Sequence, residues 1–209
     1  DDMDAVASSI ESYSNHRMLQ KLALMIIAHK STSEEIGFLR KVFKRYDTNK
    51  SGSISLQEFK QCLSKYGYTD DYMEHLFASA DLGGTNSIKY TEFLAATIES
   101  TGLVNEERVA EAFDRLDSDD SGYITFDNLR ELLGDDVPSD DIGQIISEVD
   151  FNKDDKITYE EFLSMWDHEL EERKLENLCG INSKRTVNDL VDEVVDLSEG
   201  GSDDEKKPF

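Results

Sequence analysis

The chain has 209 residues, long enough for one large domain or two small ones, and 38% of them are hydrophobic, which suits a soluble globular protein. It carries 46 acidic and 22 basic residues, a formal net charge of −24. Such a surface repels nucleic acid and attracts cations, so a protein that binds divalent metal is favoured. No apolar run approaches the roughly 20 residues that span a bilayer, so no transmembrane segment is expected. Cys62 and Cys179 have no metal-like spacing and indicate the reduced thiols of a cytoplasmic protein.

The first element expected along the chain is a basic, apolar helix. Residues 12–33 contain no Asp or Glu, and their charged side chains are all positive. Apolar residues recur there at helical spacing, which is typical of a helix that fills the groove of another helical domain. The stripe expected to face that groove consists of Met18, Leu19, Leu22, Met25 and Ile26. Two other interpretations stay open: a helix packed permanently on the next domain, and a helix on a membrane surface.

A twelve-residue acidic segment then recurs four times. The copies are "DTNKSGSISLQE" from Asp47, "DLGGTNSIKYTE" from Asp81, "DSDDSGYITFDN" from Asp117 and "DFNKDDKITYEE" from Asp150. Apolar residues spaced by four flank each copy, so each unit is predicted to be helix, loop, helix. The eighth residue of every copy is Ile, which favours pairing between neighbouring loops. The predicted fold is therefore all-α, with two pairs of such units and short two-residue β-bridges between paired loops.

The loops have the spacing of a calcium site. Ca²⁺ takes six to eight oxygen ligands, which a twelve-residue loop supplies from positions 1, 3, 5, 7 and 9 and from a bidentate carboxylate at position 12, with a sharp turn at position 6. This is the EF-hand pattern. In the first loop the predicted ligands are Asp47, Asn49, Ser51, the carbonyl of Ser53, Ser55 and Glu58. In the fourth loop they are Asp150, Asn152, Asp154, the carbonyl of Lys156, Thr158 and Glu161, with Asp155 at the turn where Gly is usual.

The two middle loops depart from the pattern. The third loop ends in an amide instead of a carboxylate, which predicts weaker binding. Its predicted ligands are Asp117, Asp119, Ser121, the carbonyl of Tyr123 and Asn128. The second loop has Gly83 at position 3, with no side-chain oxygen, and Asn86 at the turn. A spacer that only pairs with the first loop is therefore as good an interpretation as a site. Its candidate ligands are Asp81, Thr85, Ser87 and Glu92.

Four regions are expected from these elements. Residues 1–30 form a junction, or autoregulatory, helix; residues 31–100 form the first EF-hand lobe and residues 101–180 the second. Gly102 is expected to end one helix and Asn105 to cap the next. Residues 181–209 form an acidic tail. A short helix is expected in this tail from an apolar stripe of Val187, Leu190, Val191, Val194 and Leu197.

One stretch resembles a known family. "LQKLALMIIAHKSTSEEIGFLRKVFKRYDTNKSGSISLQEF" is similar to the junction and first EF-hand of calcium-dependent protein kinases of plants and apicomplexan parasites, and "YTEFLAAT", residues 90–97, to a phrase of their second EF-hand. The resemblance implies a calmodulin-like regulatory domain. It would bind Ca²⁺, capture its own N-terminal helix and so relieve the autoinhibition of an attached Ser/Thr kinase domain.

The resemblance also bounds what this chain does. No kinase motif occurs in it, so the chain itself is not expected to be an enzyme, whereas its parent protein is expected to be a kinase. We expect a cytoplasmic location, with membrane association only through a lipidated N-terminus that this chain does not include. The alternative function is a free-standing calmodulin-like calcium sensor or buffer that binds other target helices.

Overall fold

The computed structural model describes residues 2–166, which belong to one compact unit of the chain. The expected end of the second lobe, from residue 167 to 180, and the acidic tail at 181–209 with its predicted helix lie outside the described residues.

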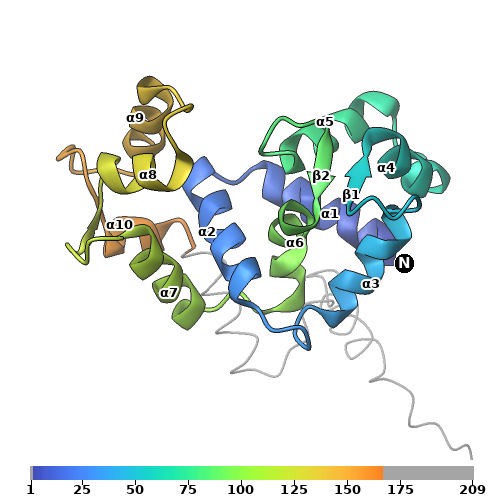
Figure 1. Ribbon diagram of the computed structural model, residues 1–209, viewed down its shortest axis with the longest axis horizontal. Helices are drawn as coiled ribbons and strands as arrows, with labels where there is room; N and C mark the ends of the chain where they lie inside the picture. The colour runs from blue at the N-terminus through green and yellow to red at the C-terminus, as the bar shows by residue number, and fades with distance from the viewer. Residues whose placement is uncertain (1, 167–209) are drawn as a thin grey trace, which may run out of the picture. The chain divides into compact units, whose positions relative to one another are not determined.

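The described residues form an all-α fold, which confirms the predicted class (Figure 1). Two short 3-10 helices in this part of the chain are Ser64–Tyr66 and Ile98–Thr101. The α-helices are α1 (Asp2–Ser14), α2 (Met18–Lys30), α3 (Gly37–Tyr46), α4 (Leu56–Leu63), α5 (Asp70–Ala80), α6 (Tyr90–Thr97), α7 (Glu106–Leu116), α8 (Phe126–Leu133), α9 (Ser139–Ser147) and α10 (Tyr159–Ser164).

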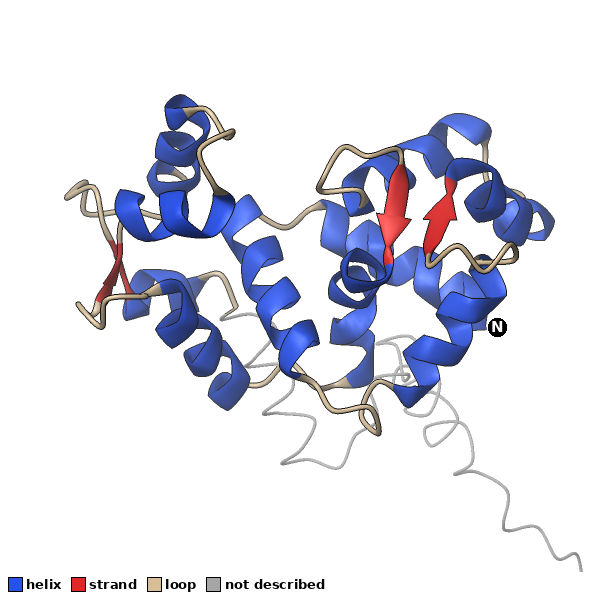
Figure 2. Ribbon diagram, in the orientation of Figure 1, coloured by secondary structure: helices blue, strands red, loops and turns tan. Residues whose placement is uncertain are grey.

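Two small antiparallel ribbons join the loops in pairs, as predicted (Figure 2). In the first ribbon, β1 (Ser53–Ser55) pairs with β2 (Ser87–Lys89), and Ile54 lies opposite Ile88. In the second, β3 (Tyr123–Ile124) pairs with β4 (Ile157–Thr158), and Ile124 lies opposite Ile157. The recurrent Ile therefore sits at the centre of each ribbon, where all four copies are fully buried. The first ribbon is one residue per strand longer than predicted.

Hydrogen bonds at the loop ends start three of the four exiting helices. The hydroxyl groups of Ser55, Thr125 and Thr158 each accept a hydrogen bond from the backbone N–H three residues later. Such an N-cap satisfies an N–H group that has no partner inside the helix. Each capping residue is the ninth of its loop, so the loop and the following helix share one hydrogen-bond network. The predicted cap at Asn105 is also present, accepting from the N–H of Arg108 at 3.0 Å.

The leading residues form two helices instead of the single junction helix expected. The chain turns after Ser14, where the N–H groups of Asn15 and His16 donate to the carbonyls of Ser12 and Tyr13. Arg17 is then extended, and α2 begins at Met18. No Pro or Gly occurs at this break. The break is explained by the different packing partners of the two helices: α1 contacts α4, α5 and α6, whereas α2 contacts α6, α7 and α9.

The second helix is part of the core of the described unit. In Figure 1, α2 lies between α6 on one side and α7 with α9 on the other, in agreement with its contacts. Leu19, Ala23 and Leu24 are fully buried, and Ile27 is nearly so. An apolar helix with so much of its surface covered contributes to the stability of both EF-hand pairs.

Candidate metal centre

The four loops share one backbone conformation. The fourth residue of each loop, Lys50, Gly84, Asp120 or Lys153, has a φ between 53° and 62°. The sixth residue is left-handed as well, with a φ of 86° at Gly52, 56° at Asn86, 85° at Gly122 and 61° at Asp155. The turn predicted at Asn86 is therefore present, and Asp155 takes a conformation that costs more for a residue with a side chain than for Gly. The second loop folds like the others despite its altered sequence.

The leading Asp of each loop is held in one orientation. In the first loop, one carboxylate oxygen of Asp47 accepts from the N–H of Ser51 at 2.9 Å and the other accepts from Gly52 at 2.9 Å. Asp81, Asp117 and Asp150 accept from the fifth and sixth residues of their own loops in the same way. This network aims each carboxylate into its loop.

The closing carboxylate bridges the two ends of the first loop. One oxygen of Glu58 accepts from the Asn49 N–H at 3.1 Å and from the Thr48 hydroxyl at 3.0 Å, and the other accepts from the Ser55 N–H at 2.9 Å. Burial raises the pKa of Glu58, but these hydrogen bonds outweigh burial and lower the pKa to about 2. The side chain is therefore an anion at neutral pH.

The fourth loop closes in the same way. One oxygen of Glu161 accepts from the N–H of Phe151 at 3.0 Å and the other from the N–H of Thr158 at 2.9 Å. Burial again raises the pKa of Glu161, and the hydrogen bonds again lower it on balance. The first and fourth loops thus end in equivalent buried carboxylates.

Hydroxyl and carbonyl oxygens of the middle positions also lie together. The Ser51 hydroxyl donates to the Ser53 carbonyl at 2.9 Å, and Thr85 to Ser87 and Ser121 to Tyr123 do the same at 3.1 Å. In the fourth loop the Asp154 carboxylate accepts from the N–H of Lys156 at 3.1 Å. The Ser55 hydroxyl, a predicted ligand, instead donates to Glu58 at 2.7 Å.

The first and fourth loops fit a calcium ion. Each combines two buried carboxylates at positions 1 and 12 with further carboxylate, amide, hydroxyl or carbonyl oxygens, which is the oxygen-only set that Ca²⁺ prefers. Asn49 and Asn152 complete these sets at position 3. In residues 2–166 no three His, Cys, Asp or Glu side chains form a ready-made metal cluster. The mixed carboxylate, amide, hydroxyl and carbonyl oxygens of the two loops suit calcium.

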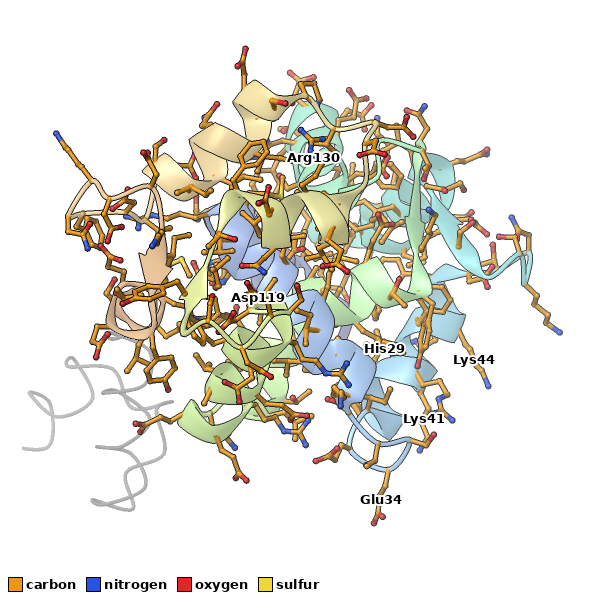
Figure 3. All side chains as sticks on the ribbon, turned by 60° about the vertical axis from the view of Figure 1, so that its left-hand side comes forward. His29, Glu34, Lys41, Lys44, Asp119 and Arg130 are labelled. Atoms are coloured by element: carbon orange, nitrogen blue, oxygen red, sulfur yellow. The ribbon has the colours of Figure 1, made fainter. Side chains whose placement is uncertain are left out.

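The third loop does not fit in the same way. Asn128 accepts with its Oδ1 from the Thr125 N–H at 2.8 Å, and its Nδ2 donates to Ser118 Oγ at 3.1 Å and to Asp119 Oδ1 at 3.2 Å. The hydrogen bond from Asn128 is the largest cause that lowers the pKa of Asp119. Figure 3 labels Asp119 in this loop and Arg130 on α8 beyond it. The Asn128 side chain offers a donor where the other closing residues offer an acceptor.

In the second loop, the closing carboxylate and a cationic side chain border the same space. Glu92 accepts from the N–H of Gly83 at 3.0 Å and from that of Lys89 at 2.7 Å. A Cβ added at Gly83 would lie 3.4 Å from Glu92 Oε1 and 3.8 Å from Lys89 Nζ. The space of the missing third-position ligand therefore borders both groups. The sequence indicated the missing side-chain oxygen at Gly83, but Lys89 was not expected to take part in this loop.

The predicted stripe of α2 is only partly covered. Leu19 and Leu22 are buried, Met25 and Ile26 are half-buried, and Met18 is 39% exposed. Met18, Leu22, Met25 and Ile26 line an open cavity of about 650 Å³ that also borders the second loop and helices α8 and α9. The most buried face of α2 is therefore not the predicted one.

A further apolar stripe escaped the sequence analysis. Val6, Ile10 and Tyr13 of α1 are spaced by four and three and are all buried. This spacing was visible in the sequence and would have predicted the second leading helix.

Polar contacts tie the leading region to both EF-hand pairs. Arg108 of α7 donates to Ser31 Oγ at 3.1 Å and pairs with Glu35 at 2.5 Å. His16, just before α2, lies 2.8 Å from Glu99 at the end of the first pair. The residue before α2 that forms this contact thus reaches the first pair, and the residues after α2 reach the second.

Comparisons with known proteins agree with this geometry. Residues 38–98 and 106–166 match the family model described as "EF-hand domain pair". Calcium-dependent protein kinases 34 and 17 of Arabidopsis thaliana are 40% and 39% identical over 166 residues, 78% of this chain and 32% and 31% of theirs. Calcium-dependent protein kinase 2 of Zea mays is 38% identical over 165 residues, 77% of this chain and 32% of its own length. The expected resemblance is confirmed.

The matches cover the EF-hand region of longer proteins. The chain spans about a third of the length of the curated relatives, and its family match is to EF-hand pairs, not to a kinase catalytic domain. In the part of the chain that the structure describes, no helix is long and apolar enough to cross a membrane.

Proposed function

Because the chain belongs to the EF-hand family, we propose that it is a calcium-sensing regulatory domain that grips its own leading helices and thereby relieves the autoinhibition of a Ser/Thr kinase domain in a longer protein. The observation that carries the proposal is the place of α2, which is buried between two EF-hand pairs of its own chain. The names of the relatives support the attached kinase domain.

The first loop is proposed to act on α1 through α4. Glu58 closes the loop and is also the third residue of α4, so a change in the position of its carboxylate moves the start of that helix. Helix α4 in turn contacts α1. Bound Ca²⁺ supplies the positive charge that gathers the loop oxygens. Asp47, Asn49, Ser51, the Ser53 carbonyl and Glu58 would hold it.

The fourth loop is proposed to act on α2 through α10. Glu161 closes this loop and is the third residue of α10. Met165, which directly follows α10, accepts a hydrogen bond from Gln20 of α2 at 3.3 Å. Asp150, Asn152, Asp154, the Lys156 carbonyl and Glu161 would hold the ion. Each loop that fits calcium therefore starts a helix that leads directly to one of the leading helices.

Two calcium sites supply enough free energy for such a switch. Moving a population from 1:99 to 99:1 takes about 5.5 kcal/mol of differential binding, so each of two sites must contribute about 2.7 kcal/mol, roughly a hundredfold preference. Sensor EF-hands bind at about 10⁻⁷ to 10⁻⁵ M, which leaves room for that preference.

A second candidate function is an adaptor that binds helices of other proteins. The cavity of about 650 Å³ beside α2 favours it, because Met18 and Met25 line this cavity and flexible Met side chains suit varied partners. In that case the leading helices would be a fixed part of the fold.

Deletion of residues 1–30 separates the two functions. If the domain grips its own leading helices, added peptide 1–30 displaces a hydrophobic dye from the truncated protein more strongly in Ca²⁺ than in chelator. If the leading helices are a fixed part of the fold, the displacement is the same with and without Ca²⁺. Unchanged dye binding with and without residues 1–30 would contradict the proposal.

Single substitutions test the metal sites in the full chain. Glu58→Gln and Glu161→Gln should each weaken Ca²⁺ binding at one site by at least tenfold in calorimetry, since each removes a bidentate charge. Glu34→Gln is the matched control, because Glu34 is exposed and points away from the loops (Figure 3). Binding that survives both loop substitutions would contradict the assignment.

A further inference from the structure

The second and third loops keep the EF-hand backbone conformation, but nitrogen atoms lie at or beside the places where the first and fourth loops have oxygen ligands. Their left-handed residues and leading carboxylates match those of the first and fourth loops. In the third loop, however, an amide nitrogen of Asn128 contacts the position-3 carboxylate, and in the second an ammonium nitrogen borders the empty space at position 3, where a calcium loop needs oxygen. The second and third loops thus have the shape of the calcium loops but different chemical groups inside them.

In the third loop, the orientation of the Asn128 amide is set by its partners. The Thr125 backbone N–H only donates, so the atom that faces it at 2.8 Å must be the amide oxygen. The amide NH₂ then faces Ser118 and Asp119. A flipped amide would place its oxygen against the Asp119 carboxylate and its NH₂ against the Thr125 N–H, two repulsive contacts.

A donor in this place opposes a cation. In the first loop the matching atom, Glu58 Oε1, accepts hydrogen bonds from Asn49 and Thr48. In the third loop Asn128 Nδ2 donates to Asp119, the third-position carboxylate. One predicted ligand is therefore turned into a donor and a second is engaged by it.

In the second loop, the ninth position differs from the other three. That position holds a hydroxyl in Ser55, Thr125 and Thr158, each of which caps the following helix, whereas the second loop has Lys89. Its ammonium and the Glu92 carboxylate both border the space that Gly83 leaves empty of side chain. A tethered positive charge at this place opposes the charge of an incoming cation.

We propose that the protein's own nitrogen atoms, the Lys89 ammonium and the Asn128 amide, close the second and third loops in place of a metal ion, so that each EF-hand pair binds a single Ca²⁺. This inference rests on the proposed function for the first and fourth loops. It departs from the expectation of a weaker calcium site in the third loop.

The arrangement has a consequence for α2. The helices that α2 contacts most, α6 and α7, follow the second loop and precede the third. Both belong to hands that are closed without metal. The surface on which α2 packs is therefore present without Ca²⁺. Bound Ca²⁺ strengthens the packing of the leading helices through α4 and α10. The ribbon residues Ile88 and Ile124 give each metal loop a fixed partner strand.

Calorimetric stoichiometry of the full chain tests the proposal. We expect two equivalents of Ca²⁺ for the native protein, and three for Asn128→Glu, which replaces the donor with a bidentate carboxylate. Asn128→Gln is the matched control and should stay at two. Three or four equivalents for the native protein would overturn the inference.

A double substitution tests the role of Lys89 in the second loop. Gly83→Asp with Lys89→Ser supplies the missing oxygen and removes the tethered cation, so it should gain one equivalent. Gly83→Asp with Lys89→Arg keeps the cation and should gain none; equal gains in both would overturn the role of Lys89. A second readout is thermal unfolding in chelator, where Lys89→Ser should lower the melting temperature and Lys89→Arg should not.

The outcomes separate this inference from the proposed function. If the native chain bound no Ca²⁺, the proposed function would fail, and the Lys89 readout in chelator would still decide whether the second loop is closed by nitrogen. If the native chain bound two ions that Glu58→Gln and Glu161→Gln did not remove, the assignment of nitrogen-closed loops would be wrong.

Discussion

The Nε2 atom of Gln20 donates a hydrogen bond to the carbonyl oxygen of Met165, at 3.3 Å. These residues are far apart in the sequence: Gln20 is in the first turn of α2, and Met165 directly follows α10. Gln20 is buried, so the hydrogen bond is sheltered from water. It links the leading helix to the helix that the fourth loop starts.

Replacing Gln20 with Ala should weaken calcium binding at the fourth loop. A neutral hydrogen bond contributes about 1 kcal/mol net, so we expect roughly a fivefold loss of affinity if that energy couples α2 to the site. Calorimetry on the Glu58→Gln background isolates the fourth loop. Gln144→Ala, on the exposed surface of α9, is the control. An unchanged affinity in Gln20→Ala would show that this contact does not carry the coupling.

Trp166 provides an intrinsic optical reporter of the same link. It is the single Trp of the chain, it is fully buried, and it follows Met165. Its emission should therefore change with Ca²⁺ in the native protein and in Glu58→Gln, but much less in Glu161→Gln, where the fourth loop no longer closes. The same response in all three proteins would contradict the path from Glu161 through α10.

Replacing Leu24 should destabilise the protein far more than replacing Met18. Leu24 is fully buried on α2, whereas Met18 is 39% exposed. Truncation of a buried Leu to Ala costs about 2–5 kcal/mol, and truncation of an exposed side chain usually changes stability by less than about 0.5 kcal/mol. Denaturant unfolding of Leu24→Ala and Met18→Ala measures the difference. Equal losses would mean that α2 does not pack through this face.

Acid should destabilise the metal-free protein partly through Glu58. Its pKa is lowered to about 2 in the fold from an ordinary value of 4.5. Because the folded pKa is the lower one, Glu58 contributes stability above pH 4.5, and this contribution is lost as the pH falls from 4.5 towards 2. In chelator, Glu58→Gln should show a shallower loss of stability over that interval. Parallel curves for the two proteins would contradict the assignment.

Local patterns explain what the sequence made predictable. The twelve-residue spacing, the recurrent Ile and the turn at Asn86 depend on neighbours within one loop or its partner, and the structure places each as expected. The break after Ser14 was missed because it has no Pro or Gly and follows from where α1 and α2 pack. The buried face of α2 was misjudged for a related reason: α2 is apolar nearly all round, so periodicity alone selects no face.

The chemistry of the second and third loops could not be predicted from the sequence. Gly83 and Asn128 were recognised as departures, yet a missing ligand and a ligand replaced by a donor look alike in sequence. The distinction depends on the orientation of the Asn128 amide and on the position of the Lys89 ammonium, which follow from contacts in the folded structure.

Amide hydrogen exchange of α1 tests the central claim most directly. If calcium at the first loop tightens the grip on the leading helices through α4, the amides of residues 2–14 should exchange more slowly in Ca²⁺ than in chelator, and Glu58→Gln should remove the difference. Equal exchange rates for residues 2–14 in Ca²⁺ and in chelator, in a native protein shown to bind Ca²⁺, would contradict the account.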